Sequence, residues 1–447
     1  MSRPLQSKLR LLLGVLLALA LALAGWKTLQ RQPLAPLSPV GPAADQPAFL
    51  LKTVAQTAST GHAGFGAGFV SSVPGLAVHA ASLVELRDGR LRAVWFSGSR
   101  EGAGDVAIRS AVMDPVTFRW GDESILYDRE TLQKGLWRYV RKVGNPVIAR
   151  APDGSLWLWM VNVSLGGWAG SAITWARSED EGQSWSAPRR LVTSPFLNVS
   201  TLVKGAPFVR QDGAIGLPVY HEFLTKLGEV LEINQHGQVV DKVRIPGSRT
   251  HLQPVVLVTG PQQAQVYMRS GLAQSLMSSK TEDAGNTWAT ASATAWPNPD
   301  SALAGVVTHS GTQWLALNPG PRDREVLALL QTQTGQTFNG ARPFMVASSP
   351  TPQTRLSRAG YAGLLDRELR AQGASESQAQ QFIESASRQL CGSQTCSQEF
   401  SYPYLLQARD GTVHLLYTWH RARIKHVWFD PKAMPSTLEP ARAATSH

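Results

Sequence analysis

Short apolar runs recur along the chain, and turn residues separate them in pairs. The clearest pair lies near the C-terminus, where residues 404–408 and 412–418 flank the dipeptide Asp410-Gly411. Asp-Gly between two apolar runs predicts a β-hairpin, because glycine readily adopts the positive φ that a tight turn requires. A third apolar run, residues 424–429, follows a basic corner. This part of the chain therefore predicts a three-stranded antiparallel meander rich in aromatic and β-branched residues.

The same pair of runs around a turn recurs upstream. The further turns lie at Asp88-Gly89, Asp153-Gly154, Asp212-Gly213, Gly260 and Ser310-Gly311. Their spacing of roughly 50–65 residues is typical of four-stranded blades arranged radially, so the fold class predicted is all-β, a six-bladed β-propeller. The last interval is longer because residues 348–397 intervene. The strand-like residues 48–55 are expected to close the ring as the outer strand of the last blade.

A second motif repeats with the pattern S/T-x-D-x-G-x-S/T-W. It occurs at residues 178–185 and 281–288, and a degraded copy lies at residues 332–338. In such a turn the aspartate accepts backbone N–H groups and the glycine supplies an unusual backbone conformation, while the aromatic residue packs beneath. Asp180 and Asp283 are therefore predicted to be structural residues.

The ends of the chain differ in composition from the repeats. Residues 1–10 are basic, residues 11–26 are apolar and uncharged, and residues 27–46 are rich in proline and alanine. The apolar segment is interpreted as a signal peptide or as a signal anchor in the inner membrane, and either one predicts export to the periplasmic or cell-envelope side. The proposed boundaries are a linker at 27–46, the propeller at 47–432 and a tail at 433–447.

Residues 348–397 form an insertion of a different kind, with helical composition at 361–370 and 375–390. Cys391 and Cys396 are the two cysteines of the chain, and their spacing is compatible with a disulfide loop in an exported protein. The insertion precedes the last blade, so it lies over the site or decorates the surface. Neither the cysteines nor other motifs indicate a metal site or a cofactor.

The formal net charge is +11, although only 17% of the residues are charged. A basic excess favours an acidic partner such as an anionic glycan, or it reflects a basic surface without a dedicated partner. The basic residues are scattered and no nucleic-acid-binding motif is present, so no nucleic-acid partner is predicted.

Polar residues recur a short distance before each turn, where the innermost strand of a blade begins near the axis. This first set comprises His79, Asn145, Lys204, Gln253, Asp300 with Ser301, and Tyr402. A second set, at the ends of the second strands, comprises Arg100 with Glu101, Asn162, His221 with Glu222, Arg269, Asn318, and Trp419 with Arg421. We expect both sets to surround a central cleft; the alternative is that they bond strand-end backbone groups.

Several motifs together make the chain resemble the sialidase superfamily, in particular bacterial proteins with BNR or Asp-box repeats. They are HAASLVEL, VWFSGSREG, GNPV, LQPVVL, YMRS, WPNPDS, LNPG, EFSYP and YTWHRARIKH, and they span residues 78–430. The resemblance implies a sialidase-like propeller that acts on, or binds, an anionic glycan.

The resemblance also implies roles for particular residues. Arg269 and Arg324, with Arg322 as a substitute, match two arginines that hold the substrate carboxylate, while His79 occupies the position of the first arginine. Tyr402 matches the tyrosine nucleophile, Glu222 is its expected carboxylate partner with Glu399 in reserve, and Asp105 is the expected acid/base with Asp300 in reserve.

The preferred interpretation is a retaining hydrolase that releases a terminal acidic sugar, sialic acid or a related one. Two alternatives stay open at this point. One is a non-catalytic propeller that recognises a glycan during envelope polysaccharide assembly. The other is a polysaccharide lyase, in which Tyr402 and His79 would transfer protons next to a uronate carboxylate.

Overall fold

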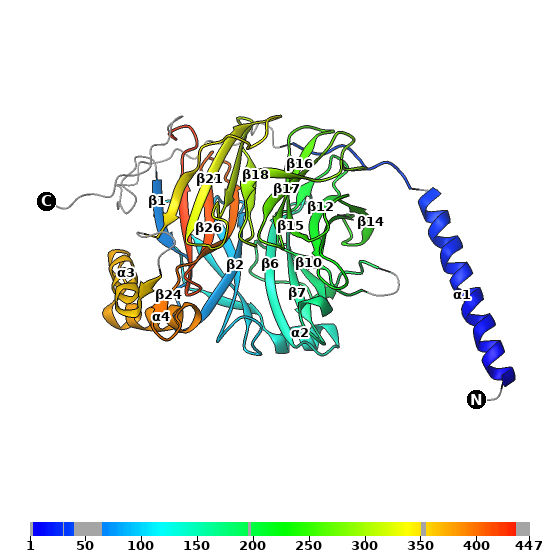
Figure 1. The fold of residues 1–447 in the computed structure, drawn as a ribbon, viewed down its shortest axis with the longest axis horizontal. Coiled ribbons are helices and arrows are strands. Elements are labelled where there is room, and N and C mark those ends of the chain that lie inside the picture. The colour runs from blue at the N-terminus through cyan, green and yellow to red at the C-terminus, as the bar shows by residue number, and fades with distance from the viewer. Residues whose placement is uncertain (1–2, 30, 40–64, 195–197, 350–354, 435–447) are drawn as a thin grey trace. The chain divides into compact units, whose positions relative to one another are not determined.

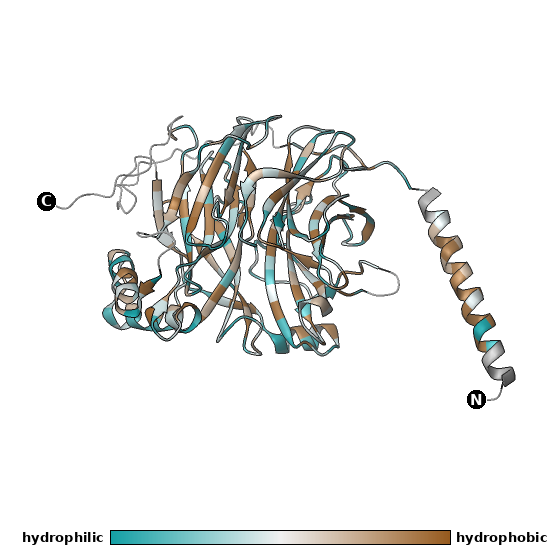
Figure 2. Cartoon of the chain, in the orientation of Figure 1, coloured by the Kyte–Doolittle hydropathy of each residue, from teal (hydrophilic) through white to brown (hydrophobic). Residues whose placement is uncertain are grey.

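The computed structural model describes residues 3–29, 31–39, 65–194, 198–349 and 355–434. The chain divides into two compact units between Ala35 and Pro36. The first contains one helix, α1 (Arg3–Leu29), in which Lys8–Trp26 is long and apolar enough to cross a membrane. Figure 2 shows apolar residues along most of this helix. Such a helix is consistent with a signal sequence or an anchor.

Among the described residues, the second unit contains six sheets of four or five antiparallel strands, as a six-bladed propeller requires, and a separate two-stranded sheet in the insertion. The first three blades are β2 (Ala77–Glu85), β3 (Leu91–Gly98), β4 (Ala107–Met113) and β5 (Ser124–Tyr127); β6 (Lys142–Arg150), β7 (Leu156–Val163), β8 (Ser171–Ser178) and β9 (Arg189–Arg190); and β10 (Leu202–Val203) with β11 (Phe208–Val209), β12 (Ile215–His221), β13 (Leu227–Ile233) and β14 (Val239–Arg244). Short helices α2 (Arg129–Leu136) and η1 (Trp168–Gly170) lie between strands of these blades.

The remaining blades follow in chain order (Figure 1). They are β15 (His251–Val258), β16 (Ala264–Ser270), β17 (Ser275–Thr281) and β18 (Ser292–Pro297); β19 (Ala304–Val307), β20 (Thr312–Leu317), β21 (Val326–Gln333) and β22 (Phe344–Ser348); and β25 (Phe400–Gln407), β26 (Val413–Trp419) and β27 (Arg423–Phe429) with β1 (Phe65–Phe69). Each turn predicted from the sequence lies between the innermost strand of a blade, which in the third blade is split into β10 and β11, and the strand that follows it. The six-bladed fold is therefore confirmed.

The strand that closes the ring differs from the one expected. β1 pairs with β27 as the outer strand of the last blade, with Phe65 opposite Phe429. The segment predicted for this place, residues 48–55, lies outside the described residues. β1 has the sequence FGAGF, and its glycines give it a weak β propensity. A Cβ atom on Gly66 would lie 2.1 Å from the Trp428 ring, so glycine is required there by close packing.

Most second strands are buried along their whole length, because each blade is covered by a neighbour on both faces. Every residue of β3 and β7 is buried, and Trp95, Trp157 and Trp159 have at most 1% of their surface exposed. Strands buried on both faces have continuous apolar sequences rather than alternating ones. This packing fixes the inner strands, and the polar residues considered below lie where these strands begin.

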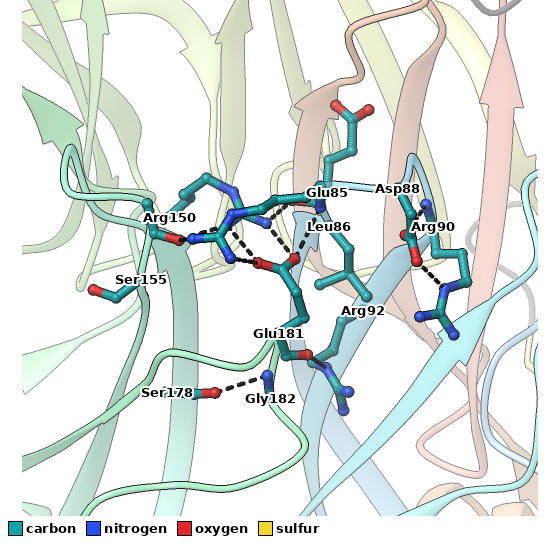
Figure 3. Close-up of polar contacts among 12 residues, drawn as sticks. Glu85, Leu86, Asp88, Arg90, Arg92, Arg150, Ser155, Ser178, Glu181 and Gly182 are labelled. Atoms are coloured by element: carbon teal, nitrogen blue, oxygen red, sulfur yellow. Dashed lines mark hydrogen bonds and ion pairs between the residues drawn. The ribbon is translucent and has the colours of Figure 1, made fainter.

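The two complete repeat motifs form the turns that the sequence predicts. Asp283 accepts hydrogen bonds from the backbone N–H of Thr287 at 2.9 Å and from its hydroxyl at 2.6 Å, and Asp180 binds Ser184 in the same way. The first motif also joins two blades: Glu181 accepts from the backbone N–H of Arg87 in the first blade at 2.8 Å, and from Arg150 in its own blade at 2.7 and 2.9 Å (Figure 3). Both aspartate side chains therefore stabilise turns of the fold.

Substitution of Asp283 by alanine should lower the free energy of unfolding by about 1–2 kcal/mol, because the buried Thr281 hydroxyl and both donors of Thr287 lose their shared acceptor. Chemical denaturation followed by tryptophan fluorescence measures this change. The neighbouring substitution Glu282→Gln alters only an exposed ion pair with Lys280 and should have little effect. Equal stability of the two variants would contradict the structural role of Asp283.

The insertion folds into two helices, α3 (Arg358–Ala371) and α4 (Glu376–Leu390), which begin at the caps Ser357 and Ser375. The strands β23 (Leu356–Ser357) and β24 (Thr395–Cys396) close its base, and the predicted disulfide between Cys391 and Cys396 is formed.

Buried polar contacts bind α3 to the last blade. The Tyr361 hydroxyl lies 3.1 Å from Nδ1 of His420, and Nε1 of Trp419 donates to Glu368 at 3.1 Å. Glu368 also forms an ion pair with Lys425. The insertion is therefore fixed next to the turn between β26 and β27, which carries Arg421.

Candidate functional site

A repeated backbone distortion presents the polar residues at the start of the inner strands. In five blades one residue there has a positive φ, between 39° and 54°: Ala80, Asn145, Gln253, Asp300 and Tyr402. In four of these blades the strand register shifts at the same point, which marks a β-bulge. A bulge redirects a side chain at the end of a sheet, and the left-handed conformation is unfavourable for residues other than glycine. Such positions persist where the surrounding packing fixes them, and they cluster at functional sites.

The third blade presents its polar residue, Lys204, without such a distortion. Its inner strand is interrupted between β10 and β11, and Lys204 lies in the gap. The Lys204 ammonium donates to the Pro403 carbonyl at 3.0 Å and lies 5.9 Å from the centre of the Tyr402 ring. Burial lowers the pKa of Lys204 to about 7.

Tyr402 lies at the centre of this group. Its hydroxyl oxygen accepts a hydrogen bond from Arg269 at 3.0 Å and a longer one from Gln253 at 3.5 Å. The guanidinium groups of Arg269 and Arg324 lie 5.9 and 5.8 Å from the centre of its ring, and the His79 ring lies at 4.0 Å. The phenol oxygen thus accepts from two side chains, and two guanidinium groups lie beside its ring.

Two carboxylates, those of Asp300 and Glu399, form ion pairs with the three arginines of the site. Arg269 pairs with Asp300 at 2.6 Å, Arg324 with Glu399 at 3.2 Å, and Arg421 with Glu399 at 2.8 Å. Burial would raise the pKa of Glu399, but Arg421 and Arg324 outweigh it and lower the pKa to about 2. The three guanidinium groups are thus fixed in place before any ligand binds.

Two other predicted catalytic carboxylates have different surroundings. Glu222 is half-buried, and its carboxylate makes no hydrogen bond within the described residues. Burial raises its pKa, although Lys226 and Arg269 oppose the shift. Asp105 is exposed, and its two oxygens accept from the backbone and hydroxyl of Ser99 at 2.8 and 3.0 Å. Of these two carboxylates, that of Glu222 has no hydrogen-bond partner among the described residues, and it lies near Arg269.

The structure brings most of the first predicted set together, but several members of the second set lie apart from Tyr402. The Asn318 side chain is fully used between Ser301, Val326 and Phe400, and Trp419 is buried beneath the insertion. Arg100 is exposed on the loop after β3. Asn318 and Trp419 therefore support the backbone around the site.

Tyr220 is a site residue that the sequence analysis did not find. Its hydroxyl oxygen accepts from Asn145 at 3.2 Å and from Gln253 at 3.3 Å, so it connects two of the predicted residues. Tyr220 lies at the end of β12, one residue before His221, where its apolar neighbours in the sequence indicate a core tyrosine. The sequence signal for Tyr220 is its place directly before His221, a member of the second polar set.

Comparison with known families identifies the repeats. The sequence model of a family described as a BNR repeat-like domain matches residues 89–415. The chain belongs to the BNR repeat-like domain family. A search of curated proteins finds no match.

Several solved structures resemble this BNR repeat-like protein. The Hadza microbial sialidase Hz136 is 15% identical with a TM-score of 0.59, and the alignment covers 80% of this chain and 66% of that one. An intramolecular trans-sialidase from Ruminococcus gnavus, solved with oseltamivir carboxylate, is 11% identical with a TM-score of 0.58 and coverages of 83% and 97%. A Dyadobacter fermentans protein described as of unknown function is 11% identical with a TM-score of 0.61 and coverages of 82% and 99%. These similarities establish the sialidase-like propeller fold.

Proposed function

We propose that the protein is a sialidase-like glycoside hydrolase that releases a terminal acidic sugar and uses Tyr402 as its nucleophile. The observation that carries this proposal is the environment of the Tyr402 hydroxyl. Tyr402 lies on a bulge near the start of β25. Its hydroxyl oxygen accepts a hydrogen bond from Arg269, and cationic side chains surround its ring. A core tyrosine would not require this arrangement.

The chemistry follows from the charges of the reacting groups. A carboxylate nucleophile would be repelled by an acidic sugar, whereas a tyrosine is neutral until it loses its proton to a base. The phenol oxygen then bonds to the anomeric carbon as the glycosidic bond breaks, and the leaving oxygen receives a proton. Water next displaces the tyrosine, so the sugar leaves with retained configuration.

Glu222 is the proposed base and Asp105 the proposed proton donor to the leaving group. A raised pKa and a free carboxylate suit a group that exchanges protons near neutral pH. Glu222 makes no hydrogen bond to Tyr402, so proton transfer requires the side chain to rotate or a water molecule to mediate. Asp105 would likewise exchange its contacts with Ser99 for the leaving oxygen.

Arg269 and Arg324 are the proposed binding groups for the sugar carboxylate. They flank Tyr402, and their carboxylate partners Asp300 and Glu399 limit the freedom lost when a ligand binds. A planar guanidinium matches the geometry of a carboxylate better than a lysine does. This arrangement supports an anionic substrate.

One observation favours a second candidate, the polysaccharide lyase. Tyr402 and His79 are in ring contact, and a lyase needs such a pair next to a neutralised uronate carboxylate. The same assay separates the two reactions, because a lyase creates an unsaturated uronate that absorbs ultraviolet light. A propeller that only recognises a glycan would give neither product.

The test is an assay of the full-length protein, purified in detergent, on sialosides, uronosides, neutral aryl glycosides and acidic polysaccharides. Release of one acidic sugar with retained configuration, detected by chromatography and by NMR of the first product anomer, is the expected result. Binding of an acidic glycan without turnover of any substrate would contradict the hydrolase and leave the recognition propeller. An ultraviolet-absorbing product from an acidic polysaccharide would establish the lyase.

A further inference from the structure

We propose that a cleft beside Tyr402 is a subsite for an uncharged, hydroxyl-bearing substituent of the bound sugar, and that His79 is the residue that recognises it. This inference rests on the proposed binding of a sugar at Tyr402, and it adds a specificity residue to that site. The cleft is lined by His79 and Phe96 of the first blade, the adjoining Glu101, Arg421 of the last blade and Gln389 of the insertion.

His79 forms part of the wall between the cleft and the nucleophile. Its ring centre lies 4.0 Å from that of Tyr402 and 5.7 Å from that of Phe96. Only 4% of the residue is exposed. A group bound in this cleft is therefore adjacent to a sugar bound at Tyr402.

The polar atoms of His79 lack partners. Both ring nitrogens are buried, and neither forms a hydrogen bond within the part of the chain that the structure describes. Buried polar atoms are almost always hydrogen-bonded, because they lose their contacts with water on folding. Two unpartnered nitrogens on the wall of a cleft next to the candidate nucleophile thus indicate a ligand.

The charge of His79 determines which ligand group fits. Burial lowers its pKa well below the usual value, and Arg421 lowers it further, so the imidazole is neutral. A neutral imidazole has one donor and one acceptor nitrogen. A hydroxyl group both donates and accepts, whereas a carboxylate only accepts. The other polar residues of the cleft also provide both donors and acceptors of hydrogen bonds: Glu101 is an acceptor, Arg421 is a donor, and Gln389 is both.

The insertion provides one wall of this cleft. The Ser385 hydroxyl donates to the Leu76 carbonyl at 2.7 Å, and Arg388 donates to the Gly75 carbonyl at 2.8 Å. These contacts fix α4 against the segment that leads into β2. Gln389 itself reaches the Ser99 carbonyl only at 3.5 Å, so its side chain is free to turn toward a ligand. The helical insertion is therefore part of the site rather than a decoration of the surface.

A binding experiment with deoxy sugars tests the subsite. The full-length Tyr402→Phe protein, which cannot form the glycosyl intermediate, is titrated by calorimetry with N-acetylneuraminic acid, glucuronic acid and the monodeoxy analogues of each. For the sugar that binds, one deoxy analogue should bind about tenfold more weakly than its parent, since it lacks one hydrogen bond. In the Tyr402→Phe/His79→Phe protein this difference should disappear, because the partner of that hydroxyl is gone.

Two further variants separate recognition from a structural effect. Tyr402→Phe/His79→Gln keeps a donor and an acceptor and should restore part of the difference between parent and deoxy sugar. Tyr402→Phe/His236→Phe changes an exposed histidine on a distant turn and should behave like the single variant. If His79→Phe weakens the parent and every analogue equally, or none of them, the subsite is overturned while sugar binding stands. Failure of both acids to bind overturns the subsite and the proposed function together.

Discussion

Substitution of Tyr402 by phenylalanine should lower the release of acidic sugar by about 10³-fold or more, because it removes the oxygen atom that bonds to the anomeric carbon. The fold should not change, since within the described residues the phenol oxygen forms hydrogen bonds only with the side chains of Arg269 and Gln253. The measurement is kcat/KM on the aryl glycoside that the wild-type protein cleaves, together with the thermal midpoint of each protein.

A matched control lies on the same strand. Tyr404 is buried two residues away and also packs near the Lys204 ammonium, which lies 5.7 Å from its ring. Tyr404→Phe removes the same oxygen atom from the core rather than from the site, so kcat/KM should stay within about twofold. Comparable activity of the Tyr402 and Tyr404 variants would exclude a nucleophilic Tyr402 and point to catalysis by another group.

The fold was predictable because its signals are local. An Asp-Gly turn between apolar runs specifies a hairpin within about ten residues, and the repetition of that unit specifies the propeller. The caps at Ser357 and Ser375 and the cysteine pair specify the insertion in the same local way. The closing strand β1 was missed because its pairing with β27 depends on a contact between Gly66 and Trp428, far apart in the sequence.

The candidate site was predictable only as a set of positions. The phase of the repeat indicated that Gln253, Asp300 and Tyr402 lie where inner strands begin. All three have a positive φ in the structure, and Gln253 and Tyr402 lie on bulges. The phase of the repeat did not indicate which charged side chains would form ion pairs. Glu399 joins arginines from two blades, and Tyr220 joins Asn145 to Gln253, through contacts between segments that are distant in sequence. Such pairings depend on how neighbouring blades pack together and leave no local pattern.

The central position of Glu399 leads to the second large effect. Glu399→Gln keeps the shape of the side chain but leaves Arg324 and Arg421 without their shared carboxylate. Removing one member of a buried ion pair leaves an uncompensated charge, and the free energy of unfolding should fall by about 3 kcal/mol. Urea unfolding measures the change, and Glu282→Gln, in an exposed ion pair with Lys280, should cost less than about 1 kcal/mol.

The same substitution predicts a pH dependence whose sign follows from the lowered pKa of Glu399. Below its ordinary value of 4.5 the unfolded chain takes up a proton that the folded chain excludes down to pH about 2. The stabilisation by Glu399 is therefore complete above pH 4.5 and is lost as the pH falls toward 2. The difference in unfolding free energy between wild type and Glu399→Gln should be constant from pH 5 to 8 and shrink below pH 4.5. A difference that stays constant down to the lowest pH at which both proteins fold would show that Glu399 stabilises the protein by packing alone, and that Arg324 and Arg421 do not depend on its charge.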